Sequence, residues 1–187
     1  MNNPEMAYLR GIELSWQTHL WYLPGLLGGI VLDLNASFMS SNQMYPYFDA
    51  VRTGGSVIRP IYSMVYKMRS GHLQDQPEAT YNAIVGWDYK GFSSRFSFRY
   101  QKLTLTSLDT RYSIRDAYYA NVLLVDIALK QQIFENFSLF ANVTNLNSHI
   151  DNYYLNYYNG LDGTSGELPT SNQTYGLAAQ VGFGYNF

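Results

Sequence analysis

The last fifteen residues, Gln173 to Phe187, alternate strictly between two kinds of side chain. Every second residue is apolar or aromatic: Tyr175, Leu177, Ala179, Val181, Phe183, Tyr185 and Phe187. The residues between them are small or polar: Thr174, Gly176, Ala178, Gln180, Gly182, Gly184 and Asn186. Because successive side chains of a strand point to opposite faces, this run predicts one strand with an apolar face and a small, polar face.

The length of this run constrains its setting. A strand of a soluble domain usually has about five or six residues, whereas a strand that crosses a bilayer at a tilt needs about ten. The run also finishes on an aromatic residue, Phe187. These features are typical of a transmembrane β-barrel, whose last strand closes the sheet and leaves no open edge in lipid. The alternative is the edge strand of a soluble β-sandwich.

The composition agrees with a membrane barrel. Charged residues make up 14% of the chain, against roughly 25% in soluble domains. Aromatic residues make up 17%, with 18 tyrosines, as expected for the two aromatic girdles of an outer-membrane barrel. The chain has no cysteine, which excludes disulfides and thiol chemistry, and its net charge of −2 gives no nucleic-acid surface. No apolar run is long enough for a transmembrane helix.

Six more alternating strands precede the last one, and their connections alternate in length. The expected strands are 8–21, 30–38, 79–90, 92–101, 123–130 and 137–144. Short turns follow the first, third and fifth strands. Longer polar connections, at about 40–78, 107–116 and 147–172, follow the others, and a short strand at 61–67 is an open possibility. Outer-membrane barrels sort their connections in this way, with short periplasmic turns and long extracellular loops.

The predicted fold is therefore all-β, a transmembrane antiparallel up-and-down barrel. In that fold the apolar strand faces contact lipid, and seven charged residues face the interior: Glu13, Asp33, Asp88, Arg95, Arg99, Asp126 and Lys130. We expect Arg95 to form an ion pair with Asp88. In a soluble sandwich the same apolar faces would instead pack on each other.

Several motifs, in order along the chain, resemble the C-terminal part of TonB-dependent outer-membrane receptors. Arg10-Gly-Ile-Glu-Leu14 and Leu23-Pro-Gly-Leu-Leu-Gly-Gly-Ile30 resemble a strand–turn–strand pair, and Tyr89-Lys-Gly-Phe-Ser93 resembles a later periplasmic turn. Phe137-Ser-Leu-Phe140 with Asn142-Val-Thr-Asn145 is similar to the penultimate strand, and Tyr175 through Phe187 to the final one. The resemblance implies a barrel of about 22 strands around an N-terminal plug domain. Residues 1–187 would supply about the last seven strands.

The resemblance also implies a function. The whole protein is expected to bind a scarce ligand at the bacterial cell surface and import it across the outer membrane with TonB-coupled energy. The ligand classes are ferric siderophore, haem, cobalamin and oligosaccharide. The implied partners are outer-membrane lipid, the TonB complex through a missing N-terminal part, the barrel assembly machinery and a surface lipoprotein. Residues 1–6 do not have the features of a signal peptide, so we expect the chain to be the C-terminal piece of a longer one. Because the plug, the TonB box and the earlier strands are not in it, this chain alone is not expected to transport.

Two alternatives stay open. One is a small, self-standing eight-stranded outer-membrane barrel with a structural or adhesive role, which needs a strand at 61–67. The other is a soluble β-sandwich, or a surface enzyme built on a barrel. No Ser–His–Asp set, phosphate loop or zinc motif is visible, so no enzyme and no cofactor are expected.

The candidate site residues are few. Tyr153, Tyr154, Tyr157 and Tyr158 lie in an expected extracellular loop, where they could stack on a ligand or else pack the loop itself. Phe187 resembles the C-terminal signal for barrel assembly, and it could also anchor the strand at the interface. No metal site is expected, because the three histidines have no ligand spacing and Asp109 and Asp116 do not have that of a calcium loop.

Overall fold

The computed structural model describes residues 5–158 and 165–186. They form antiparallel strands almost throughout, with two short 3₁₀ helices, η1 (Gly25–Gly29) and η2 (Ser113–Arg115). The prediction of an all-β, antiparallel fold is confirmed. Within the described residues the main sheet stays open, with free edges at its first and last strands, and no closed barrel is detected.

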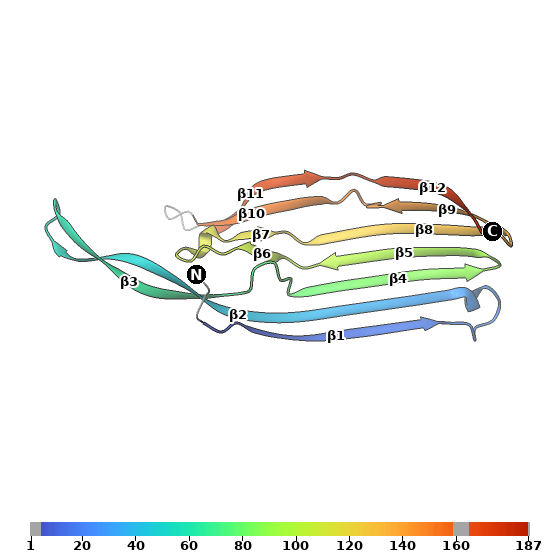
Figure 1. Cartoon of the computed structure of the whole chain (residues 1–187), viewed down its shortest axis with the longest axis horizontal. Coiled ribbons are helices and arrows are strands. Elements are labelled where there is room, and N and C mark those ends of the chain that lie inside the picture. Colours follow the sequence, from blue (N-terminus) through green and yellow to red (C-terminus); the bar gives the residue numbers. More distant parts are fainter. Residues whose placement is uncertain (1–4, 159–164, 187) are drawn as a thin grey trace.

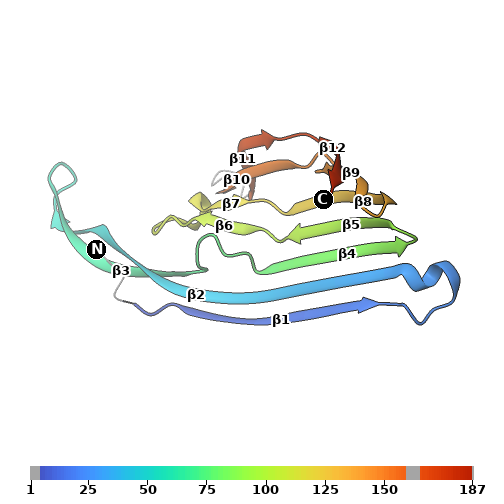
Figure 2. The ribbon, with the colours of Figure 1, turned by 45° about the vertical axis from the view of Figure 1, so that its right-hand side comes forward.

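Seven strands lie side by side in the order in which they follow one another, each antiparallel to the next (Figure 1). They are β1 (Tyr8–His19), β2 (Ile30–Gly55), β4 (Ala79–Tyr89), β5 (Phe92–Gln101), β8 (Val122–Phe134), β9 (Phe137–Thr144) and β12 (Ala178–Tyr185). Figure 2 shows that the sheet is twisted, because β9 and β12 are foreshortened in a view where β1 and β2 still run across the page. A strand is therefore present at each of the seven predicted positions, although β12 covers only part of the run predicted for 173–187.

The connections that join β1 to β2, β4 to β5 and β8 to β9 lie at one end of the sheet (Figure 1). β4 and β5 are joined by two residues, Lys90 and Gly91, whose φ angles are 47° and 77°. Positive φ at both positions defines the type I′ turn, whose twist matches that of the strands it joins. β8 and β9 are joined by Glu135 and Asn136, and β1 and β2 by a longer segment that contains η1. The C-terminal end of β12 lies at this same end of the sheet (Figure 1).

The prediction of a polar connection at 40–78 is wrong over most of that range. β2 continues to Gly55, and β3 (Pro60–Gly71) pairs with its outer half from Gln43 to Gly55. The two strands form a long hairpin that projects beyond the sheet (Figure 1). Beyond Asn42 β2 pairs only with β3, and such an edge position tolerates Pro46, which has no N–H to donate. The open possibility of a strand at 61–67 is thus realised.

The predicted loop 147–172 is also wrong, since most of it is strand. β6 (Thr104–Ser107), β7 (Ala117–Tyr119), β10 (Ile150–Tyr158) and β11 (Ser165–Thr174) form a second sheet in the order β11-β10-β7-β6. These strands continue the lines of β5, β8, β9 and β12 toward the end from which the hairpin projects (Figure 1). The single strand predicted for 173–187 is therefore two strands, separated at residues 175–177, where Gly176 has a φ of 69°.

Little of the chain is buried. Among the described residues the buried apolar side chains are Ala79, Leu105, Leu108, Val122 and Tyr154. All but Ala79 lie in the second sheet, in the connection beside it or at the start of β8. The main sheet is a single layer, and the second sheet extends it instead of covering it (Figure 1). The stacked faces of a soluble sandwich are thus not observed in the part of the chain that the structure describes.

Candidate functional site

The register places the apolar side chains of all seven main strands on one face of the sheet. One row of paired residues crosses six strands: Leu32, Val85, Phe96, Ile127, Val143 and Ala179. A neighbouring row contains Trp16, Leu34, Ala83, Phe98 and Val125. Because the pairing is continuous, the alternation seen separately in each strand combines into one apolar surface.

This apolar face is exposed. The side chains of Trp16, Val181 and Phe183 are 54%, 80% and 70% exposed. Six strand spacings make the sheet about 29 Å wide, so the apolar face is larger than the few hundred Å² that a soluble monomer usually exposes. Such a surface needs to be covered, either by a surrounding apolar phase or by another protein.

Aromatic rings form two bands across this face. At the outer end Phe38, Tyr81 and Tyr100 make a chain with ring centroids 5.5 and 5.8 Å apart. At the turn end Trp87 packs on Tyr89 and Phe92 with centroids 5.6 and 5.8 Å apart. Tyr81 and Tyr89 are eight residues apart on β4, which is about 27 Å along the strand and about 20 Å in height at a tilt near 40°. This spacing is close to the apolar band of roughly 25 Å in outer-membrane barrels.

The opposite face carries the charged residues that were predicted to share one side. The register places all seven on it: Glu13, Asp33, Asp88, Arg95, Arg99, Asp126 and Lys130. The predicted ion pair is confirmed, because Arg95 donates to both carboxylate oxygens of Asp88 at 2.7 Å. Gln17 donates to Asp33 at 2.9 Å, and Asp126 accepts from the backbone N–H of Asn145 at 2.8 Å. The sheet therefore has one apolar and one hydrogen-bonded polar face.

The candidate tyrosines lie on β10, in the outer sheet. Tyr153 stacks on Tyr119 with centroids 4.8 Å apart, and Tyr154 stacks on Tyr118 at 5.6 Å. Consecutive residues of a strand point to opposite faces, so Tyr153 and Tyr154 do not share one surface. Burial and the nearby Glu167 raise the pKa of Tyr154 to about 12. Tyr157 is 42% exposed, and the side chain of Tyr158 and the whole of Phe187 lie outside the described residues. The ligand-binding role of these tyrosines and the assembly role of Phe187 stay predictions.

A buried ion pair that the sequence did not suggest joins the hairpin to the outer sheet. Arg69 on β3 donates to the two carboxylate oxygens of Asp116 at 2.7 and 2.5 Å, and also to the carbonyl oxygen of Asp109. The Asp116 side chain is only 4% exposed and accepts the N–H of Asp109 at 3.0 Å. Arg111 of the same loop donates to the Phe48 carbonyl on β2 at 2.5 Å. The loop at 107–116 is thus fixed against the hairpin.

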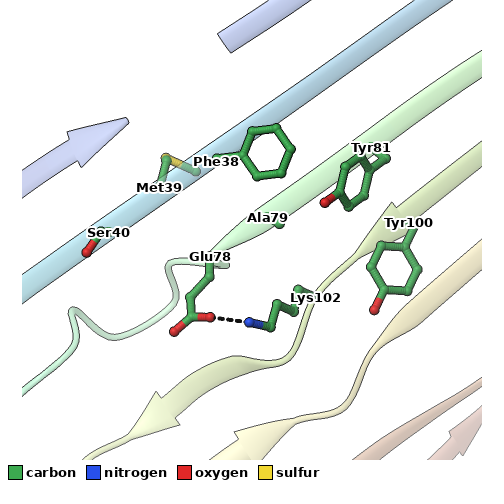
Figure 3. Close-up of a pocket in the computed structure, with 8 residues that line it drawn as sticks. All are labelled: Phe38, Met39, Ser40, Glu78, Ala79, Tyr81, Tyr100 and Lys102. Carbon is green, nitrogen blue, oxygen red and sulfur yellow. Dashed lines mark hydrogen bonds and ion pairs between the residues drawn. The ribbon is translucent and has the colours of Figure 1, made fainter. Parts of the chain in front are cut away.

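A hollow of about 680 Å³ lies at the outer end of the apolar face (Figure 3). Its lining combines the ring chain of Phe38, Tyr81 and Tyr100 with the ion pair of Glu78 and Lys102. Hydrogen bonding to Lys102 lowers the pKa of Glu78. A second hollow of about 530 Å³ lies in the outer region, beside Arg69, Tyr118 and Glu167.

Comparison of the chain with known protein families, with characterised proteins and with solved structures found no match. None of the described helices is long and apolar enough to cross a membrane. Among residues 5–158 and 165–186 no three or more His, Asp or Glu side chains gather as a metal site.

Proposed function

We propose that the seven-stranded sheet is part of a transmembrane β-barrel of the bacterial outer membrane, with its apolar face in lipid. The observation that carries this proposal is the unbroken apolar face between two aromatic bands, backed by a polar face. Aromatic bands at both interfaces and strict alternation of lipid-facing and lumen-facing residues are the pattern of such barrels. The short turns at one end and the long outer extensions at the other agree with periplasmic and extracellular sides.

The direction of the strands favours a larger barrel. Neighbours alternate in direction across the seven strands, so β1 and β12 run the same way. Antiparallel closure of β12 on β1 therefore needs an odd number of additional strands between them. A small eight-stranded barrel would use residues 61–67 as its eighth spanning strand. Those residues belong to β3, which pairs with residues 43–55, beyond the rows that β2 shares with β1 and β4.

We further propose that this barrel is that of a TonB-dependent receptor, which binds a scarce ligand at the cell surface and imports it. The ordered motifs from Arg10 to the final strand support this proposal, and the sheet order agrees with their order in the chain. The ligand classes remain ferric siderophore, haem, cobalamin and oligosaccharide. The TonB complex, the assembly machinery and a surface lipoprotein are the proposed partners. In this proposal β6, β7, β10, β11 and the β2–β3 hairpin form the extracellular end of the barrel.

A matched pair of substitutions tests which face contacts lipid. Val181 pairs with Ala141 on the apolar face, and the neighbouring Gln180 pairs with Asn142 on the polar face. Val181→Arg places a charge in the hydrocarbon, at a cost of about 2–4 kcal/mol at the midplane. We expect it to reduce the amount of protein in the outer-membrane fraction, measured by fractionation and immunoblotting, while Gln180→Arg inserts normally. Equal insertion of the two variants would contradict the proposed orientation of the sheet.

A further inference from the structure

The hollow at the outer end of the apolar face has the composition of a boundary between hydrocarbon and lipid headgroup. Phe38, Tyr81 and Tyr100 share the apolar face, and the rows directly inside them hold Leu34, Ala83 and Phe98. Ionisable groups begin on the other side of the rings, with Glu78 and Lys102 at the outer ends of β4 and β5 (Figure 3). The change from aliphatic to aromatic to charged side chains takes place within a few residues.

The two tyrosine rings are oriented along this gradient. The hydroxyl groups of Tyr81 and Tyr100 lie on the side of their rings that faces the Glu78–Lys102 pair (Figure 3). Aromatic side chains with one polar end favour the membrane interface, where the ring contacts lipid and the hydroxyl group contacts water or headgroups. A lipid in the hollow could therefore place its chain along the rings and its head beside the ion pair.

The charges at the hollow favour an anionic head. Lys102 lies two residues after Tyr100 and four after Phe98, so its side chain is on the same apolar face. Its ammonium group has three N–H donors. Glu78 is its one partner among the described residues and also lies 3.8 Å from His72. Arg10 shares the apolar face with Ile12 and pairs with Ser40, which lines the hollow. Arg10 and Lys102 thus lie on either side of the hollow, and together they outweigh Glu78.

The exposed rings between the two cations favour a lipid head over a free ion. β1 and β5 are separated by three strand spacings, about 14 Å. Arg10 on β1, beside Ser40, and Lys102, after β5, therefore flank the hollow on its two sides, and both have side chains long enough to reach toward it. A phosphate ester carried on a lipid head can interact with both cations while its chain covers the rings. Free phosphate would pair with the cations but would leave the rings of Phe38, Tyr81 and Tyr100 uncovered.

We propose that this hollow binds the phosphate-bearing head of an anionic membrane lipid, with Arg10 and Lys102 as its cationic ligands and Tyr81 and Tyr100 beside its chain. Glu78 limits the affinity, because it competes with the phosphate for Lys102. This inference rests on the proposed membrane-spanning function and adds a specific lipid site to it.

The test uses the complete barrel protein that contains this chain, inserted into phosphatidylcholine vesicles that contain some phosphatidylglycerol, as the wild type and as Arg10→Gln, Lys102→Gln and Glu78→Gln. Native mass spectrometry measures the ratio of phosphatidylglycerol to phosphatidylcholine retained on the protein. A cation near an anionic surface contributes about a five-fold factor, so we expect Arg10→Gln and Lys102→Gln each to lower the ratio about five-fold. Glu78→Gln is expected to raise it. Lys130→Gln, on the polar face, is the control and leaves it unchanged.

The outcomes separate the two proposals. Failure of the complete wild-type barrel protein to insert would contradict the membrane-spanning function itself. Normal insertion with the same lipid ratio in all variants, or an equal loss in Lys130→Gln, would overturn only the lipid site. Inorganic phosphate is added in a parallel measurement. If it displaces phosphatidylglycerol completely, the site is one for free phosphate, and the lipid proposal is wrong.

Discussion

At the scale of single residues, the most consequential contact is the ion pair between Arg69 and Asp116. The two residues lie 47 positions apart, and nothing in the sequence around either one indicates the other. The sequence drew attention to Asp109 and Asp116 only as possible calcium ligands, whereas the structure gives both oxygens of Asp116 to an arginine. By contrast, the Arg95–Asp88 pair was predictable, because a two-residue turn places the two side chains on the same face of adjacent strands.

Asp116→Asn is expected to loosen the outer region without unfolding the sheet. It removes the negative charge opposite Arg69 and leaves that guanidinium largely buried, which costs on the order of 2 kcal/mol. Hydrogen–deuterium exchange should become faster at residues 107–116 and stay unchanged in β4 and β5. Asp49→Asn is the matched control. Asp49 pairs with Lys67 in the same hairpin, but its side chain is more exposed than that of Asp116, so its loss should have little effect. Equal changes in both variants would show that the buried pair has no special role.

At the scale of elements, the strands that cross the apolar band were predictable and the outer ones were not. β4, β5 and β9 agree with the expected strands to within one residue, because one face of each is apolar and the other polar. The outer half of β2 lacks this contrast: Tyr45 and Tyr47 alternate with Pro46 and Phe48, and both faces are accessible to solvent. Gly54 and Gly55 also resemble a loop. β6 and β7 are too short to produce a pattern, and only pairing with β10 makes β7 part of a wider sheet.

The turn between β4 and β5 offers a test at this scale. Gly91 has a φ of 77°, and an L-residue in this region costs roughly 1–2 kcal/mol. Gly91→Ala is expected to lower the thermal unfolding temperature of the detergent-solubilised chain. Gly54→Ala is the control, because a Cβ there meets nothing within 4 Å and its φ is not in the left-handed region. A larger effect at Gly54 than at Gly91 would contradict the turn geometry.

At the scale of the whole molecule, the sequence predicted seven strands and their two faces, and it could not identify the neighbours of the two edge strands. Closure into the proposed barrel would depend on which strand meets β1 and which meets β12, and neither edge has a partner among the described residues. The alternating residues of β12 are compatible with any antiparallel neighbour, so the pattern itself does not identify one. The strand directions supply the missing constraint, since seven strands cannot close antiparallel by themselves.

The receptor proposal predicts the size of the protein in the cell. An antibody raised against residues 152–157 should detect, in the outer-membrane fraction, a band several times larger than the 21.4 kDa of this chain. The physical reason is that the edges of β1 and β12 both need partners in lipid. A band near 21.4 kDa that changes mobility on heating would instead indicate a small closed barrel, and the receptor proposal would be wrong.

The 26-residue strand β2 is about 86 Å long at its usual rise, and its outer thirteen residues, 43–55, span about 43 Å. With the inner half in the bilayer, as we propose, the hairpin tip would stand well clear of the lipid surface. Val57 and Ile58 at that tip are 88% and 91% exposed. In the proposed orientation this tip is the part of the described chain that an antibody would meet first on an intact cell, and it is therefore the epitope of choice for labelling the protein from outside.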